Sequence, residues 1–187
     1  MWLNLGSRRS DGNPATAERG WTKVDLEDAD IIRDLSAFPW PWADGSVHGV
    51  LAGHIIEHFP KAGAYRFIRE CYRILRPGGL IRIAAPDLDR FIQGRVTGDW
   101  SLTGGKPEFS FDHFFGGPIW EDGLPPPGAH LCMYNAESVL YMLRESGFKD
   151  ERKVECGESK WRMLRNVDTE LHRPVSMYLE ARRGRRK

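Results

Sequence analysis

Short apolar runs separated by turn residues dominate the chain and predict a β-sheet. We interpret as strands the runs at residues 2–5, 21–25, 29–34, 47–56, 80–85, 152–156 and 175–181. The runs at 47–56 and 80–85 are almost continuously apolar, which is typical of strands that are covered on both faces.

Helices are predicted between several of these strands. After Pro60, apolar residues recur every three or four positions, as on one face of a helix. Asp87 can cap a short helix over residues 88–93, and Asn135 can cap another that ends at Gly147.

Strands that alternate with helices favour a parallel sheet with right-handed crossovers. We therefore predict an α/β fold: a Rossmann-like, mostly parallel sheet with helices on both faces and an antiparallel last strand. Only fourteen residues separate Gly6 from Trp21, so the first crossover helix must be very short or absent.

Residues 94–130 have a different composition from the rest of the chain. They include eight glycines, five prolines and six aromatic residues, which are Trp100, Phe109, Phe111, Phe114, Phe115 and Trp120. Because long loops in compact domains are usually lids or binding loops, we expect an insertion that borders the substrate pocket. Residues 1–181 are predicted to form one domain, and residues 182–187 a disordered basic tail.

Composition limits the function classes. The chain has 187 residues, of which 41% are hydrophobic and 28% charged, as in a single globular domain. Its apolar runs are too short to cross a bilayer, so no membrane association is expected. The three cysteines form no complete disulfide framework, and a cytoplasmic location is expected. The oligomeric state is not predicted.

The net charge of +1 gives no overall field for nucleic acid. The last six residues contain five cations, but the aromatic residues cluster elsewhere in the chain instead of interleaving with them. Nucleic acid is therefore not an expected partner.

A glycine and an acid are spaced as in nucleotide-binding folds. Gly6 follows the first predicted strand, and Asp25 ends the second strand nineteen residues later. Such a glycine lets the backbone approach a ligand, and such an acid accepts hydrogen bonds from ribose hydroxyls. An ordinary turn and a surface aspartate explain the same pattern.

The segment His54-Ile55-Ile56-Glu57-His58 has the form of an inverted zinc-protease signature. Two imidazoles on one helical face would hold zinc, and the glutamate would act as general base. The segment follows a strand-like run and precedes Pro60, which leaves little room for such a helix. We predict no metal site, and a zinc hydrolase is the most distant alternative.

Five blocks of sequence resemble class I SAM-dependent methyltransferases of the small methyltransferase-domain type, in order and in spacing. They are LNLGS at 3–7, GWTKVDL at 20–26, DGSVH at 44–48, GHIIEHF at 53–59 and RILRPGG at 73–79. The helix that ends at Phe148 resembles the closing helix of the same family. The resemblance accounts for Glu57 and His58 without zinc.

The resemblance implies S-adenosylmethionine (SAM) as the cofactor and a set of residues that bind it. The implied cofactor contacts are Gly6 and Ser7 to the methionine part, Asp25 to the ribose, Leu26 beside the adenine, Asp34 and Leu35 near the adenine amino group, and His54 beside the transferred methyl. The sequence departs from the family at Asn4, where an acid is usual, at Arg8, where a glycine is usual, and at His48, where an aspartate is common.

The implied activity is methyl transfer to an oxygen or nitrogen of a small-molecule or glycan acceptor. Such an acceptor needs a base, and histidine titrates near neutral pH. The candidate catalytic residues are His54, His113 and His130. The main alternative is a non-catalytic protein of the same fold that binds a ligand or a partner, because fold alone does not establish chemistry.

Overall fold

The computed structural model describes residues 1–10, 14–101, 128–168 and 172–184. Its elements, in chain order, are β1 (Trp2–Leu5), α1 (Pro14–Glu18), β2 (Trp21–Asp25), β3 (Ile31–Ile32), β4 (Val47–Gly53), the 3₁₀ turn η1 (Ile56–His58), α2 (Lys61–Ile74), β5 (Leu75–Pro86), α3 (Leu88–Thr97), α5 (Ala136–Glu145), β6 (Phe148–Val154), the 3₁₀ turn η4 (Arg162–Leu164) and β7 (Ser176–Arg183).

One seven-stranded sheet organises these elements, with the strand order β3-β2-β1-β4-β5-β7-β6. The first five strands of this order pair in parallel, and β7 runs antiparallel to both β5 and β6. The predicted fold class and the antiparallel last strand are therefore confirmed.

The first crossover is as short as its sequence length requires. α1 has five residues and packs beside β2. Arg19, which follows α1, donates a hydrogen bond to the carbonyl oxygen of Arg165 near η4. α1 and η4 thus lie on one face of the sheet.

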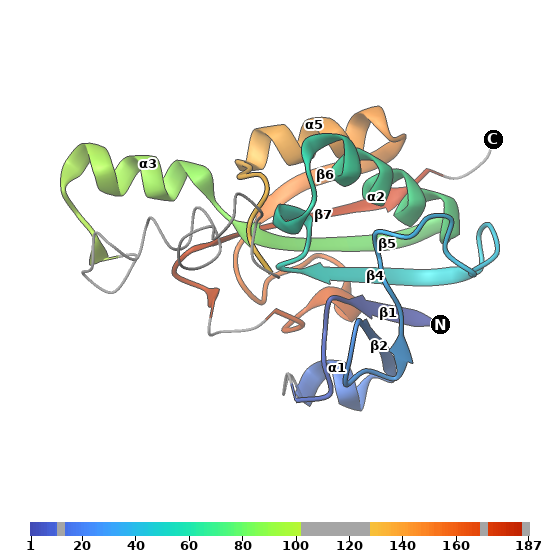
Figure 1. Ribbon diagram of the computed structural model, residues 1–187. Helices are drawn as coiled ribbons and strands as arrows, with labels where there is room; N and C mark the ends of the chain where they lie inside the picture. Colours follow the sequence, from blue (N-terminus) through green and yellow to red (C-terminus); the bar gives the residue numbers. More distant parts are fainter. Residues whose placement is uncertain (11–13, 102–127, 169–171, 185–187) are drawn as a thin grey trace.

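The other face carries the main core. α2 packs against β5 and α5, and α5 packs against β6 and β7. In Figure 1 both helices lie alongside these strands, whereas α3 projects beyond the end of β5. Alternate strand residues such as Leu3, Val50, Ile83 and Leu179 point into this core, together with Phe67 of α2.

The face beside α1 holds a smaller apolar cluster, formed by Trp21, Leu51, Leu164 and Val167. Residues 155–168, which join β6 to the C-terminal part of the chain, supply half of that cluster. This coil segment occupies a face that helices cover elsewhere in such folds.

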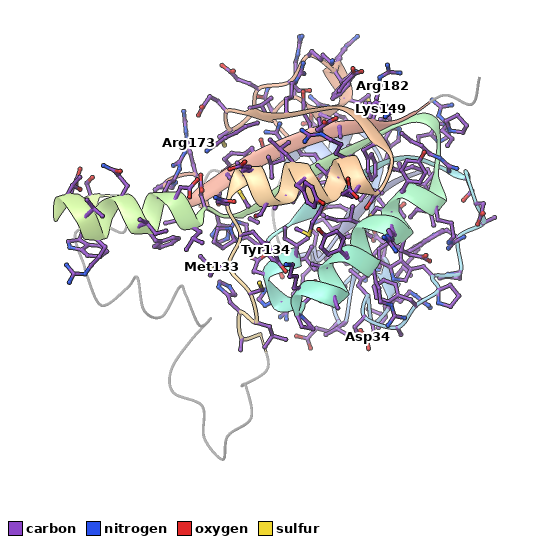
Figure 2. All side chains as sticks on the ribbon, turned by 90° about the horizontal axis from the view of Figure 1, so that it is seen from above. Asp34, Met133, Tyr134, Lys149, Arg173 and Arg182 are labelled. Carbon is purple, nitrogen blue, oxygen red and sulfur yellow. The ribbon has the colours of Figure 1, made fainter. Side chains whose placement is uncertain are left out.

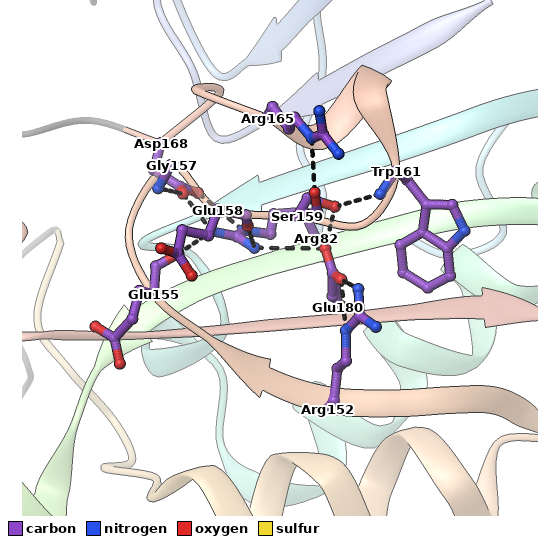
Figure 3. A network of polar contacts seen from close by, with 10 residues as sticks. All are labelled: Arg82, Arg152, Glu155, Gly157, Glu158, Ser159, Trp161, Arg165, Asp168 and Glu180. Atoms are coloured by element: carbon purple, nitrogen blue, oxygen red, sulfur yellow. Dashed lines mark hydrogen bonds and ion pairs between the residues drawn. The ribbon is translucent and has the colours of Figure 1, made fainter.

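The same segment also covers Arg82, the one charged residue in the predicted strand 80–85. Arg82 is fully buried. Its Nε lies 2.9 Å from Oδ1 of Asp168, and its Nη1 lies 3.6 Å from Oε2 of Glu180. It also donates to the carbonyl oxygens of Glu155 and Glu158, at 3.1 and 3.0 Å (Figure 3). Ion pairs and carbonyl hydrogen bonds therefore satisfy the guanidinium inside the protein.

Several predicted boundaries are wrong by a few residues. β5 begins at Leu75 rather than residue 80, and it runs directly from the end of α2. α3 continues to Thr97 and ends at Gly98, which has the left-handed conformation that glycine adopts at helix ends. The remainder of the predicted insertion, residues 102–127, lies outside the described residues.

The predicted start of the basic tail is also wrong. Arg182 and Arg183 belong to β7, where Arg182 pairs with Asp150. Arg183 donates to the carbonyl oxygens of Arg73 and Leu75 at the end of α2. The guanidinium of Arg182 thus binds a carboxylate, and that of Arg183 binds carbonyl oxygens at a helix end. Both kinds of group attract cations.

Among the described residues, none of the helices has both the length and the apolar character that a bilayer span requires.

Replacing Arg82 by methionine should lower the free energy of unfolding by about 3–5 kcal/mol, because the buried carboxylate of Asp168 would lose its cationic partner and that of Glu180 would keep Arg152 as its cationic partner. Urea denaturation monitored by circular dichroism measures this difference.

The matched control is Arg144→Met. Arg144 pairs with Glu151 at 2.8 Å, but 60% of its side chain is exposed. Such pairs contribute about 0–1 kcal/mol. Equal losses in the two variants would contradict the assigned role of the buried network.

Candidate functional site

The carboxyl ends of β1, β2 and β4 meet at one edge of the sheet. Leu5, the last residue of β1, is paired with Val24 of β2 and with Ala52 of β4. The register therefore brings Gly6 and Asp25, which follow these pairs, next to each other. Open parallel sheets bind ligands at this edge.

Gly6 forms a tight turn at that edge. Its φ of 71° is in the left-handed region, and its N–H donates to the carbonyl oxygen of Val24 at 2.8 Å. A Cβ at this position would lie 3.0 Å from Cδ1 of Ile55. Ser7 is buried beside it. The site therefore requires glycine for both conformation and space.

The loop that follows is held by Lys23, whose role the sequence did not indicate. Its Nζ donates to the carbonyl oxygens of Arg8 and Arg9, at 2.8 and 3.2 Å. The guanidinium of Arg8 pairs with Glu27 at 2.8 Å, and its Nε lies 4.0 Å from Oδ1 of Asp25. Arg8 thus lies beside the predicted ribose ligand.

Asp25 and Leu26 offer the two kinds of surface that a nucleoside needs. Oδ1 of Asp25 accepts the N–H of Leu26 at 2.7 Å, and 16% of the Asp25 side chain remains exposed. Leu26 is 67% exposed, although it is a large apolar residue. A carboxylate beside an exposed leucine fits a ribose and a flat base.

Asp34 and Leu35 follow β3 at the same edge, but both already have partners within the protein. Oδ1 of Asp34 accepts two hydrogen bonds from Ser36, one from its hydroxyl at 2.7 Å and one from its N–H at 2.8 Å. These hydrogen bonds lower the pKa of Asp34. Leu35 is buried, and its carbonyl oxygen accepts Nε1 of Trp40. In Figure 2 Asp34 lies at the margin of the molecule. The adenine contacts of both residues stay predictions.

His54 follows β4 in a strained conformation, with a φ of 50°. Its Nε2 lies 2.8 Å from Oγ of Ser176, and that hydroxyl donates its proton to the carbonyl oxygen of His172 at 2.7 Å. Nε2 must therefore carry the hydrogen in the bond to Ser176. Nδ1 lies 3.3 Å from Oε1 of Glu57. Both ring nitrogens thus face protein groups.

Glu57 is the centre of this region, with a side chain that is 1% exposed. Burial alone would raise its pKa, but the contact with His54 and the charges of His54 and His58 hold the pKa below its ordinary value. The pKa of the nearby Tyr134 hydroxyl is raised, mainly by burial and then by Cys132 and the Glu57 charge. We infer a carboxylate anion at Glu57 and a protonated phenol at Tyr134.

The segment from His54 to His58 is not a metalloprotease helix. His54 lies outside η1, which is a single 3₁₀ turn. Two histidines four residues apart need an α-helix to share a face. The zinc-hydrolase alternative therefore lacks the geometry it requires.

His130 comes close to His58, with ring centroids 5.1 Å apart. His113, the third candidate base, lies outside the described residues. The structure thus gathers His54 and His130 around the same turn, and it leaves their catalytic roles as predictions.

A hollow of about 600 Å³ opens at the same edge, between the first turns of α2 and α5. Its lining includes Tyr65, Leu88, Cys132, Met133 and Tyr134. Figure 2 shows Met133 and Tyr134 on the segment that leads into α5. Its volume falls within the range of small-molecule sites, and its lining is largely apolar.

Comparison with known proteins agrees with this geometry. Residues 9–83 match the methyltransferase domain family. A probable S-adenosylmethionine-dependent methyltransferase of Mycolicibacterium smegmatis is 30% identical over 93 residues, which are 50% of this chain and 33% of that protein. The chain spans only about a third of the length of the curated relatives it matches.

Solved structures show the same fold. A SAM-dependent methyltransferase from Archaeoglobus fulgidus aligns with a TM-score of 0.60 at 16% identity, over 97% of this chain and 85% of the other. The 1,6-didemethyltoxoflavin-N1-methyltransferase of Burkholderia thailandensis, solved with its substrate and S-adenosylhomocysteine, aligns with a TM-score of 0.55 at 13% identity, over 97% and 70%.

Replacing Gly6 by alanine should destabilise the protein by more than the left-handed backbone alone costs, which is about 1–2 kcal/mol. The added methyl would also displace Ile55. Urea denaturation measures the loss.

Gly20→Ala is the matched control, because Gly20 has a φ of 67° but a Cβ there would meet nothing within 4 Å. If both variants lost the same free energy, the close approach of Gly6 to Ile55 would be without energetic importance.

Proposed function

Because the chain has the fold of the class I SAM-dependent methyltransferases and matches their methyltransferase domain over residues 9–83, we propose that it binds SAM and transfers the methyl group to an oxygen or nitrogen of a small-molecule or glycan acceptor. The observation that carries the proposal is the meeting of Gly6, Asp25 and His54 at the carboxyl edge of β1, β2 and β4.

The residues present fit the cofactor. The Gly6 turn has no side chain between the backbone and a ligand, and Ser7 follows it. The partly exposed carboxylate of Asp25 would accept hydrogen bonds from the ribose hydroxyls, and the exposed side chain of Leu26 would pack against the adenine. Asp34 and Leu35 complete the adenine side in this proposal.

When bound, SAM would supply a methyl group on a sulfonium sulfur, and transfer of that group would require an acceptor aligned with it. The chain's contribution is alignment. Ser176 holds Nε2 of His54 by a hydrogen bond and Glu57 lies 3.3 Å from Nδ1, so that the imidazole forms a wall beside the site. Such a wall helps to keep donor and acceptor aligned.

The hollow beside Tyr134 supports a small acceptor, because it has the volume of a drug-sized ligand and lies at the same edge. The Burkholderia enzyme, which has the same fold, is named for the methylation of 1,6-didemethyltoxoflavin. Proton removal from the acceptor is assigned to His54, His113 or His130, of which His130 borders Glu57 and His58.

Isothermal titration of the full chain with SAM and with S-adenosylhomocysteine tests the proposal. Binding of both ligands supports an enzyme that releases the demethylated product. Two silent titrations would overturn the proposal in favour of a non-catalytic protein of the same fold.

Asp25→Asn should weaken SAM binding by about 1–3 kcal/mol, which is roughly 5- to 150-fold. The asparagine keeps an oxygen for the N–H of Leu26, so the local fold is preserved. It loses the charge and one of the two acceptor oxygens that the ribose requires. Titration calorimetry measures the difference.

Asp150→Asn is the matched control, since Asp150 lies in β6 at the other side of the sheet. Its carboxylate pairs with Arg182 only at the surface. Unchanged affinity in Asp25→Asn, or the same loss in both variants, would contradict the assigned ribose contact.

A further inference from the structure

The carboxylate of Glu57 has an unusual environment for a buried charge. Among the described residues, neither of its oxygens has a partner in hydrogen-bonding geometry, although Nδ1 of His54 lies 3.3 Å from Oε1. Buried polar groups without hydrogen bonds are uncommon and costly. The two oxygens of Glu57 therefore indicate a ligand that would bind them.

Two imidazoles face the same point. One donor atom from each of Glu57, His58 and His130 can be chosen so that all three lie within 4.8 Å of one another. The three side chains come from η1 and from the segment before α5, which are more than seventy positions apart in the sequence. The fold brings them together, and sequence proximity does not.

The orientation of His58 suits metal binding. Its Nδ1 lies 3.1 Å from the carbonyl oxygen of Ala129, which can only accept, so Nδ1 carries the hydrogen. In the neutral ring the lone pair is therefore on Nε2. A metal-bound histidine typically donates its other N–H to a carbonyl oxygen in this way.

Backbone hydrogen bonds also hold the two segments of the cluster together. The carbonyl oxygen of Glu57 accepts the N–H of Leu131 at 2.7 Å and that of Cys132 at 3.2 Å. His130 is next to this connection and therefore stays near η1. The donor atoms are thus gathered before any ion binds, which lowers the cost of ordering them.

We propose that Glu57, His58 and His130 bind a divalent transition-metal ion of the Zn²⁺ type. Two imidazole nitrogens and one carboxylate oxygen are a donor set that Zn²⁺ prefers, whereas Mg²⁺ and Ca²⁺ favour oxygen ligands throughout. Three protein donors leave coordination positions for water or another oxygen ligand. His54 is not a ligand in this set.

Equilibrium dialysis of the full, chelator-treated chain against Zn²⁺, followed by metal analysis, tests the proposal. We expect one equivalent of Zn²⁺ per chain. Glu57→Gln, His58→Ala and His130→Ala should each weaken binding on the order of 100-fold, because each removes one of three ligands. His130→Ala changes a half-buried side chain and keeps the test valid if Glu57→Gln fails to fold.

Two variants serve as controls. His48→Ala removes a histidine at the opposite end of β4, and Cys132→Ser removes the thiol closest in sequence to His130 among the described cysteines. Both should keep the wild-type affinity. Any of three results would overturn the assignment. The first is no binding at 100-fold excess of Zn²⁺ over protein, the second is unchanged Zn²⁺ binding in His130→Ala, and the third is loss of Zn²⁺ binding in Cys132→Ser. SAM titration of the metal-free chain is measured separately, so a failure of the metal site leaves the proposed function tested on its own.

Discussion

The buried carboxylate of Glu57 constrains the structure at the carboxyl edge of the sheet, where the candidate site lies. Glu57 is buried at the turn between β4 and α2, and its charge requires positive or polar neighbours. His54 accordingly takes a left-handed conformation that brings its ring to Glu57, and its other nitrogen is bound by Ser176 of β7. A donor atom of His58 also lies within 4.8 Å of the Glu57 carboxylate. The charge thereby connects the middle of the sheet to the segment that enters α5.

The sheet shows how differently its two faces are built. One face has helices and aliphatic side chains, and the other has a coil segment with an ion-pair network around Arg82. A coil cannot satisfy its own backbone as a helix does, so its carbonyl groups need donors. The guanidinium supplies them to Glu155 and Glu158. The buried charge is therefore the means by which an irregular segment packs on a sheet.

The sequence predicts the fold well because periodicity and turn residues are local signals. The capping of α3 by Asp87 and of α5 by Asn135 was predicted from single residues and is confirmed. Site residues that act through long-range contacts gave no such signal: Ser176 meets His54 across 122 positions. The basic tail was misplaced because charge alone does not reveal that Arg183 has carbonyl partners at the end of α2. Whether such residues belong to a strand or to a tail depends on strand pairing, which composition does not reveal.

The position of β7 has a consequence for how the protein is made. β7 is inserted between β5 and β6, which both precede it in the chain and are synthesised earlier. Until residues 176–183 emerge, β6 has no neighbour in the sheet and the buried carboxylate of Glu180 is missing from the Arg82 network. Domains generally fold as units during synthesis, from the N-terminal end. The sheet closes only after residues 176–183 have been synthesised, so until then the nascent protein depends on not pairing its open strand edges with other chains.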